Sequence, residues 1–421
     1  MVPPLTPGYS DRMHLNIGID FGTTNSVVTA QRADGSVTVL RHATEDVFRS
    51  VLCFWSEAGR AVHAAGPRAI AAYLDEPFDS RLIMSMKSYL AQRSFRETRI
   101  LGKTYGLETL IALFLRELLE PFRAELQDAR ITVGRPVRFV GETADDAHGE
   151  QRLRAAFAQA GLPEVRIELE PAAAGHRFAN GLDHPATVLV ADFGGGTSDF
   201  SVLRFAPGAG VTPLGHAGVG VAGDALDFRI MDRVVAPLLG KGGSYRVMQQ
   251  ELPIPPGWYG NFARWHLLSL MRAPRTLRDI ADVARTADEP ERLHRLIRLI
   301  EDDAGYALYR AVSGVKAALS KADTARLEFR HADFEVAANI AREDFEAWIA
   351  PELGAIRRSV DAALADSGLD AEQVDRVFLT GGTSLVPAIR HLFAARFGME
   401  RVVSGGEFVS VAEGLALMGS G

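Results

Sequence analysis

One short motif occurs twice in this sequence. Residues 19–28 read IDFGTTNSVV, and residues 191–200 read ADFGGGTSDF. Each copy follows a short apolar run and continues into a second run with β-branched residues, the pattern of two strands joined by a Gly turn. Such a turn directs several backbone N–H groups into one concavity, which suits phosphate oxygens. The repetition therefore predicts two lobes whose hairpin turns hold one polyphosphate from both sides.

The polar side chains of the two turns suit the same ligand. Asp20 and Asp192 each end the first strand of a copy. Because a carboxylate repels phosphate, we expect these two to hold Mg²⁺, mostly through water molecules. Thr23, Thr24 and Thr197 add hydroxyl donors. Two ordinary hairpins with side-chain-capped turns are the alternative, and the matching pair of motifs favours the polyphosphate site.

A third Gly turn extends the predicted site. Residues 377–384 read VFLTGGTS, a strand that leads into Gly-Gly and then into a helix expected near Pro387. Backbone without a Cβ atom approaches a ligand closely, and a helix start favours an anion or a polar ring. Two other Gly-containing motifs are weak evidence for a nucleotide site. Gly102-Lys103-Thr104 lacks the opening Gly of a P-loop, and the GVGVAG of residues 218–223 lacks a surrounding βαβ unit.

Composition limits the class of protein. A chain of 421 residues exceeds one ordinary core, so two domains are expected. Its 47% hydrophobic content is typical of a soluble globular protein, and no apolar run approaches the roughly 18 residues of a membrane span. A net charge of −7 argues against a nucleic-acid partner. The single cysteine, Cys53, is expected to be a buried thiol in a reducing cytoplasm.

Strand-like and helix-like runs alternate through most of the chain, which predicts an α/β fold. Strands are expected at residues 51–55 and 376–380, and helices at 107–126 and 342–365. Between residues 240 and 320 the pattern is mostly helical. Residues 1–12 are interpreted as a flexible tail without the apolar segment of a signal peptide.

Six motifs, taken in order, carry a family resemblance. They read GIDFGTTNS, ITVGRPVRF, RIELEPAAA, VLVADFGGGTSDFSV, GDALD and VFLTGGTSLVP. The chain thereby resembles the nucleotide-binding domain of the 70-kilodalton heat-shock chaperones and, more broadly, the actin and sugar-kinase ATPases. The resemblance implies an actin-like ATPase fold with two duplicated ribonuclease-H-like lobes around a central nucleotide cleft. Lobe I is expected at residues 13–185, closed by a C-terminal helix at 406–421, and lobe II at 186–405 with a helical insertion at about 240–320.

The resemblance also implies roles for individual residues. Asp20 and Asp192 match the residues that organise Mg²⁺, and the catalytic candidates are Lys87, Glu170, Asp199 and Thr197. Lys87 is one of only five lysines, so its presence at a family position is informative. The residues matched to nucleotide contacts are Gly22, Thr23, Thr24, Asn25, Gly194, Gly195, Gly196, Thr197, Gly223, Asp224, Lys316, Ser320, Gly381, Gly382 and Thr383.

Three residues depart from the family pattern on the adenine side. Ser313 and Ala317 stand where a Glu and an Arg are usual on the adenine-facing helix, and Leu385 replaces an Arg that stacks on the base. Phosphate recognition is therefore expected to be intact and base recognition altered. Whether hydrolysis persists, and which base is preferred, stay open.

The resemblance implies an ATP-binding, slowly ATP-hydrolysing chaperone-like protein in the cytoplasm, with ATP or ADP and Mg²⁺ as cofactors and an unidentified protein as partner. The chain is expected to lack a peptide-binding domain, since it stops just past the closing helix. No nucleic-acid or membrane partner is expected. Two alternatives are a sugar or carboxylate kinase and a filament-forming actin relative, for which Trp258, Tyr259 and Trp265 are candidate partner contacts, although buried packing is the simpler interpretation.

Overall fold

A computed structural model gives the fold of most of the chain. It describes residues 15–75, 80–139, 144–179, 184–206, 210–263, 271–302, 304–404 and 409–419. The predicted tail at 1–12, Trp265 and parts of the predicted closing helix at 406–421 lie outside these ranges.

Two sheets share one strand order, and each contains one copy of the repeated motif. The first has the order β11-β10-β1-β2-β3, and the second has the order β14-β13-β12-β19-β20. In both, the hairpin strands are antiparallel and the strands beyond them are parallel. The strands of the first sheet are β1 (Asn16–Phe21), β2 (Asn25–Gln31), β3 (Val37–Val39), β10 (Arg130–Arg135) and β11 (Arg166–Leu169), with β4 (Phe48–Arg49) beside β2. Those of the second are β12 (Ala186–Phe193), β13 (Ser198–Ala206), β14 (Gly210–Val219), β19 (Arg376–Thr380) and β20 (Val402–Ser404).

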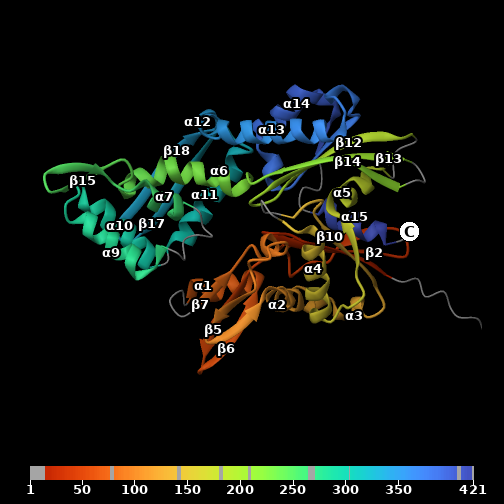
Figure 1. The fold of residues 1–421 in the computed structure, drawn as a ribbon, viewed down its shortest axis with the longest axis horizontal. Coiled ribbons are helices and arrows are strands. Elements are labelled where there is room, and N and C mark those ends of the chain that lie inside the picture. Colours follow the sequence, from red (N-terminus) through yellow and green to blue (C-terminus); the bar gives the residue numbers. More distant parts are fainter. Residues whose placement is uncertain are drawn as a thin grey trace, which may run out of the picture.

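Helices and two small sheets surround the first sheet. Figure 1 shows α2 and α4 packed below it, with β5, β6 and β7 projecting from its edge. The predicted helix at 107–126 is interrupted after Leu119, because Pro121 cannot supply a backbone donor within a continuous helix. The elements are β5 (Leu52–Glu57), β6 (Arg60–Ala65), α1 (Gly66–Asp75), β7 (Ser80–Ile83), β8 (Glu97–Ile100), β9 (Lys103–Gly106), α2 (Leu107–Leu119), α3 (Arg123–Leu126), α4 (Asp146–Ala160) and α5 (Glu170–Ala179).

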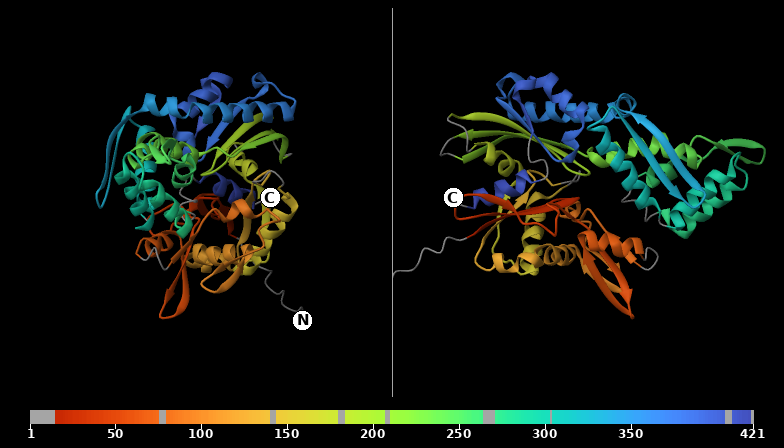
Figure 2. Two further views of the ribbon diagram at one scale, coloured as in Figure 1. Left: turned by 60° about the vertical axis from the view of Figure 1, so that its left-hand side comes forward. Right: turned by 180° about the vertical axis from the view of Figure 1, so that it is seen from behind.

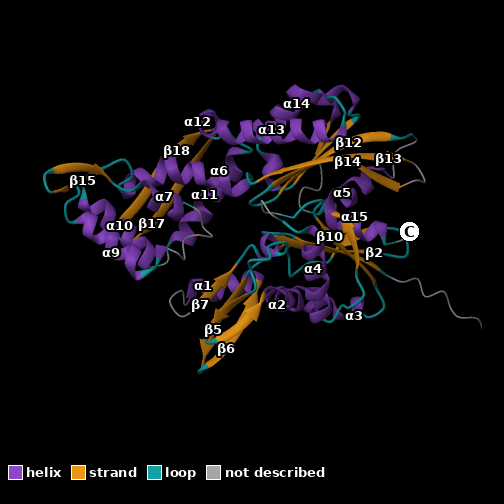
Figure 3. Ribbon diagram, viewed as in Figure 1, coloured by secondary structure: helices purple, strands orange, loops and turns teal. Residues whose placement is uncertain are grey.

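The second sheet adjoins a mainly helical region, which Figure 3 shows at the far end of the molecule. The hairpin of β15 and β16 within this region was not predicted by the helical pattern. The predicted helix at 342–365 is divided at Ile349, and Pro351 lies in the first turn of the second segment. The elements are α6 (Gly223–Ile230), β15 (Ser244–Val247), β16 (Gln250–Pro253), α7 (Pro256–Phe262), α9 (Pro274–Ala284), α10 (Pro290–Glu301), α11 (Gly305–Leu319), β17 (Thr324–His331), β18 (Phe334–Ala341), α12 (Arg342–Trp348), α13 (Ala350–Ser367) and α14 (Pro387–Phe397).

The helices α5 and α15 (Ser410–Met418) lie between the two sheets (Figures 1 and 2). α15 packs on α5 and on β1, β2 and β10. Two glycines permit this close packing. A Cβ atom on Gly18 would lie 2.1 Å from the Ala412 carbonyl oxygen, and one on Gly414 would lie 1.8 Å from that of Ala173. A chain segment near the C-terminus therefore joins the N-terminal sheet to the second one.

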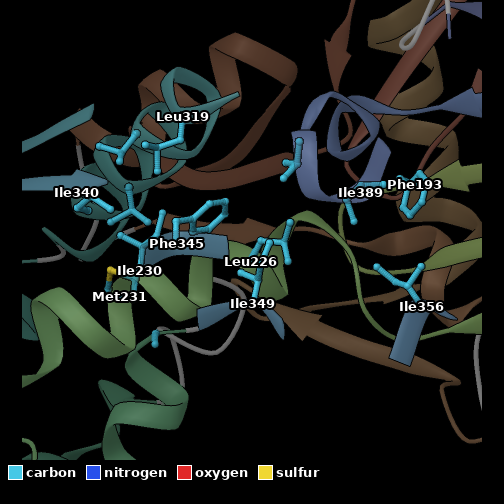
Figure 4. Close-up of a cluster of buried hydrophobic side chains, with 14 of the residues drawn as sticks. Phe193, Leu226, Ile230, Met231, Leu319, Ile340, Phe345, Ile349, Ile356 and Ile389 are labelled. Atoms are coloured by element: carbon cyan, nitrogen blue, oxygen red, sulfur yellow. The ribbon is translucent and has the colours of Figure 1, made fainter. Parts of the chain in front are cut away.

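The largest hydrophobic core belongs to the second sheet and its helical region (Figure 4). It continues from Phe193, directly before the second Gly turn, to Leu226 on α6 and Phe345 on α12. Tyr259 is fully buried in it and Trp258 packs against it, so the packing interpretation of these two residues is confirmed. Cys53 is buried, as predicted. Among the described helices, none combines the length and the hydropathy that crossing a bilayer requires.

Candidate functional site

The two repeated turns meet at the centre of the molecule. Each turn joins the first two strands of its sheet, β1 to β2 and β12 to β13. A Cβ atom on Gly195 would lie 1.9 Å from Thr24 Oγ1 of the other turn. Gly194 donates its backbone N–H to the Thr197 carbonyl across the second turn, at 2.9 Å. The duplicated hairpins therefore face each other across one cavity.

That cavity has a volume of about 460 Å³ and is lined from both sheets. Its size is in the range of small-molecule and cofactor sites. All the residues that the family resemblance selected lie on its wall, apart from Gly196. The predicted site residues on the wall are Asp20, Gly22, Thr23, Thr24, Asn25, Lys87, Glu170, Asp192, Gly194, Gly195, Thr197, Asp199, Gly223, Asp224, Lys316, Ser320, Gly381, Gly382 and Thr383.

The third Gly turn closes the cavity beside the second. Gly381 has a φ of 83°, and a Cβ atom on it would lie 2.0 Å from the Phe193 carbonyl oxygen. Only glycine fits a left-handed backbone in such close contact. The Asp224 amide, at the start of α6, donates to the Gly195 carbonyl oxygen at 2.9 Å. The turns at 194–197 and 381–383 and the start of α6 thus form one continuous wall.

Buried carboxyl groups gather at one end of the cavity. Burial raises the pKa of Asp20 to about 7, a rise that nearby Lys87 opposes and that the charges of Glu170 and Asp192 increase. Burial, together with the charge of Glu170, likewise raises the pKa values of Asp192 and Asp199 to about 7. These groups are therefore poised between their charged and neutral forms near neutral pH.

Lys87 and Glu170 form an ion pair at the same end. Lys87 Nζ donates to Glu170 Oε1, and the two residues are only 8% and 7% exposed. Burial by itself would lower the pKa of Lys87, but the charges of Glu170 and Asp20 outweigh it, so the pKa is raised and the ammonium stays charged. Glu170 is also the first residue of α5, where an acidic side chain suits the positive end of the helix.

The acidic end fits a hydrated divalent cation. Four carboxyl groups face it, from Asp20, Glu170, Asp192 and Asp199, whereas Lys87 is one ammonium already paired with Glu170. Within the described ranges, no three acidic or histidine side chains are grouped closely enough to hold a metal by themselves. Mg²⁺ usually keeps several waters and takes its other ligands from one or two carboxylates and from substrate phosphates. The arrangement suits that mode of binding.

A polar network surrounds the predicted residues Gly223, Asp224 and Lys316, and it includes Tyr309, which was not predicted. Lys316 Nζ donates to Asp227 Oδ2 at 2.8 Å and to the Gly223 carbonyl at 3.1 Å. The Tyr309 hydroxyl lies 3.0 Å from Asp224 Oδ1 and 2.9 Å from Asp227 Oδ2. Lys316 therefore lines the cavity but is paired with a fully buried carboxylate. The spacing of Tyr309, Ser313 and Lys316 along α11 was the available signal for Tyr309.

The three departures from the family pattern also lie on the cavity wall. Ser313 and Ala317 line the cavity from α11, and Leu385 lines it with 44% of its surface exposed. A smaller cavity of about 300 Å³, which shares Thr23, Ser313 and Ala317 with the first, continues toward α1 and β7. Smaller, uncharged side chains therefore stand at these three positions of the wall.

The close contact between the two turns predicts that a methyl group added at Gly195 would destabilise the protein. Gly195→Ala is expected to lower the free energy of unfolding by about 1–3 kcal/mol, because the added Cβ would overlap Thr24 Oγ1 and force the turns apart. Gly196→Ala is the matched control, since a Cβ there meets nothing within 4 Å. Thermal denaturation of both variants checks this, and equal stability would contradict the contact.

Comparison with known proteins identifies the family. The family described as Hsp70 protein matches residues 16–241 and 295–420. A chaperone protein HscA homolog from Bordetella petrii is 28% identical over 98% of this chain and 59% of its own length. A second HscA homolog, from Verminephrobacter eiseniae, is 26% identical over 93% of this chain and 56% of its own. The chaperone protein DnaK of Thermus thermophilus is 26% identical over 91% of this chain and 57% of its own.

The chain spans less than two thirds of the length of each of these relatives. Residues 242–294, which include the hairpin of β15 and β16, lie outside the matched ranges. The identical strand order of the two sheets, the meeting of their turns and the ordered match along the chain agree with one another. The predicted resemblance and fold class are therefore confirmed: this chain belongs to the Hsp70 family and has its actin-like ATPase fold, with two duplicated ribonuclease-H-like lobes.

Proposed function

We propose that this protein binds ATP or ADP with Mg²⁺ in the central cavity, hydrolyses ATP slowly and passes its nucleotide state to a protein partner in the cytoplasm. The observation that carries the proposal is the meeting of two duplicated Gly turns over a buried acidic end that contains the pair Lys87–Glu170. The lone, buried Cys53 is consistent with a reducing compartment.

In this proposal the turns hold the phosphates. Backbone N–H groups and the hydroxyls of Thr23, Thr24 and Thr197 donate to phosphate oxygens, while Asp20 and Asp192 hold the hydrated ion. When bound, Mg²⁺ offsets negative charge on the phosphates. The turn at 381–383 and the residues Lys316 and Ser320 contact the nucleoside.

Hydrolysis in this proposal depends on position and charge, as is usual for phosphoryl transfer. Lys87 stabilises the negative charge that develops on the terminal phosphate. Glu170, Thr197 and Asp199 orient the attacking water. Thr197 Oγ1 lies 3.4 Å from Asp199 Oδ2, so the two side chains face the same part of the cavity. With a pKa of about 7, Asp199 accepts a proton at neutral pH without holding it permanently.

The domain bounds are part of the proposal. Residues 13–185 with the helix at 406–421 form one lobe, and residues 186–405, with the helical insertion at about 240–320, form the other. We propose that they close on ATP and open on ADP. Because α15 packs on both α5 and the first sheet, the helices between the sheets are the expected hinge region.

The kinase and filament alternatives remain outcomes to test. The relatives reported above carry chaperone names, which favours the first function. ATP consumption that increases with a sugar or a small carboxylic acid would instead indicate a kinase. ATP-dependent pelleting would indicate a filament.

Calorimetric titration with ATP and ADP, with and without Mg²⁺, tests the proposal. We expect both nucleotides to bind, and Mg²⁺ to raise the affinity at least about tenfold, since the four carboxyl groups otherwise repel the phosphates. Titration with adenosine is the control, and its binding should not depend on Mg²⁺. Absence of binding by either nucleotide would show that the altered adenine side has abolished the site.

A further inference from the structure

A short loop after β10, at residues 136–139, reaches the acidic end of the cavity. The Arg135 guanidinium donates to the carbonyls of Pro136 and Val137, at 3.1 and 3.3 Å. The Phe139 amide donates to Asp146 Oδ1 at 2.8 Å, and Phe139 itself is only 5% exposed. The loop is therefore attached at both ends, and Arg138 is held between the two attachments.

Arg138 lies on the cavity wall together with Lys87, Glu170 and Asp199. Its position near Asp199 is supported by a buried histidine. His216 Nε2 lies 3.8 Å from Asp199 Oδ1, and burial, with the charge of Arg138 as the next contribution, lowers the pKa of His216 to about 4. His216 thus lies close to Asp199 and feels the charge of Arg138, and both Arg138 and Asp199 line the cavity.

The availability of this guanidinium distinguishes it from the two paired lysines of the cavity. Lys87 is paired with Glu170, and Lys316 is paired with Asp227. Arg49 and Lys321 also line the wall without a side-chain partner among the described residues, but Arg49 borders the smaller cavity as well, and Lys321 follows the end of α11. Within the described part of the chain, Arg138 makes no side-chain hydrogen bond or ion pair, and it is exposed to the cavity. A guanidinium presents planar donors that match a phosphate in pairs, so a free arginine here fits a terminal phosphate.

We propose that Arg138 is a further catalytic residue, which binds the terminal phosphate of ATP and stabilises its charge during hydrolysis. The proposal rests on the proposed function. In that reaction a water oxygen forms a bond to the γ-phosphorus as the bond from γ-phosphorus to the bridging β,γ-oxygen breaks. ADP leaves with that oxygen, and a water proton passes to Asp199 and then to solvent. Arg138 transfers nothing, and its charge offsets the negative charge on the three outer γ-oxygens.

The test compares Arg138→Gln, Arg138→Lys and Arg99→Gln with the wild type. Arg99 on β8 is exposed and lines neither cavity, so its variant is the control for loss of an arginine. Single-turnover hydrolysis and calorimetric affinities for ATP and ADP are measured. We expect Arg138→Gln to slow hydrolysis about 100-fold and to weaken ATP binding but not ADP binding. Arg138→Lys should retain part of the rate, because it keeps the charge.

The change in the ratio of ATP to ADP affinity is the informative readout, since a general disturbance of the loop would weaken both nucleotides equally. A wild-type rate and ratio in Arg138→Gln would overturn the role of Arg138 while leaving the proposed function intact. Equal weakening of ATP and ADP would also overturn it. If the wild type binds neither nucleotide, the proposed function fails and this assignment fails with it.

Discussion

Replacement of Lys87 by alanine is expected to slow ATP hydrolysis about 100- to 1,000-fold while nucleotide still binds. Lys87 is the ammonium closest to the acidic end, and its charge offsets those of Glu170, Asp20 and Asp192. Without the Lys87 ammonium, its positive charge no longer offsets the negative charges of the terminal phosphate and of the carboxylates. Binding is expected to persist because the two Gly turns hold the phosphates through backbone N–H groups. Single-turnover hydrolysis with parallel calorimetry measures both properties.

A second variant separates catalysis from stability. Breaking a buried ion pair from one side costs roughly 3–5 kcal/mol, since it leaves a buried charge alone. Lys87→Ala therefore also lowers the melting temperature, and Lys87→Ala/Glu170→Gln should recover much of that loss by making the partner neutral. A stable but inactive double variant would show that lost stability does not account for the lost rate, and Glu170→Gln by itself shows how much of that rate the carboxylate accounts for. The exposed Lys103 supplies the control Lys103→Ala. An unchanged rate in Lys87→Ala would refute the assigned role.

Replacement of Asp192 by asparagine is expected to stabilise the nucleotide-free protein at pH 8 and to abolish the Mg²⁺-dependent part of nucleotide binding. The pKa of Asp192 is about 7 in the folded protein and about 3.8 in the unfolded chain. Between these values the folded state holds a proton that the unfolded state releases, so the wild type loses stability as pH rises through the window. Asparagine is neutral at every pH, so the Asp192→Asn variant does not lose this stability as the pH rises.

The difference in the free energy of unfolding between Asp192→Asn and the wild type should therefore be absent near pH 4 and reach its full size at pH 8. One pKa unit corresponds to about 1.4 kcal/mol, and solvent in the cavity screens part of the shift. We expect the melting temperature of Asp192→Asn to exceed that of the wild type by about 2 °C or more at pH 8. Melting curves without nucleotide at several pH values measure this.

The comparison must be a difference between variants, because other groups titrate with the opposite sign. Burial lowers the pKa values of His42, His63, His176 and His216, so these residues reduce stability as pH falls below about 6.5. They are present in both proteins and cancel in the difference. A variant that is less stable than the wild type at pH 8 would contradict the raised pKa of Asp192.

Much of the fold and site was predictable because its signals are local. The repeated Asp-Phe-Gly turns predicted two hairpins, and the strand at 376–380 is β19 with the predicted ends. Gly161 ends α4 in the left-handed conformation, a helix end for which glycine is the usual residue. In each case a few adjacent residues determine the backbone: a Gly where φ is positive, or an apolar run with a turn after it.

The order of the motifs along the chain was enough to predict the site residues. Which side chains these residues contact depends on the tertiary structure. Lys316 was predicted as a nucleotide contact and lines the cavity, and the tertiary structure adds its pairing with Asp227, which lies on another helix. Arg138 lies within the motif ITVGRPVRF, which assigned it no role, and only the loop between its two attachments places it on the cavity wall. The sequence alone determined the turns, the duplication and the family. Pairings between segments distant in the chain, such as Thr24 with Gly195 and α15 with β1, were decided by packing, since a local pattern contains no information about which distant surface it meets.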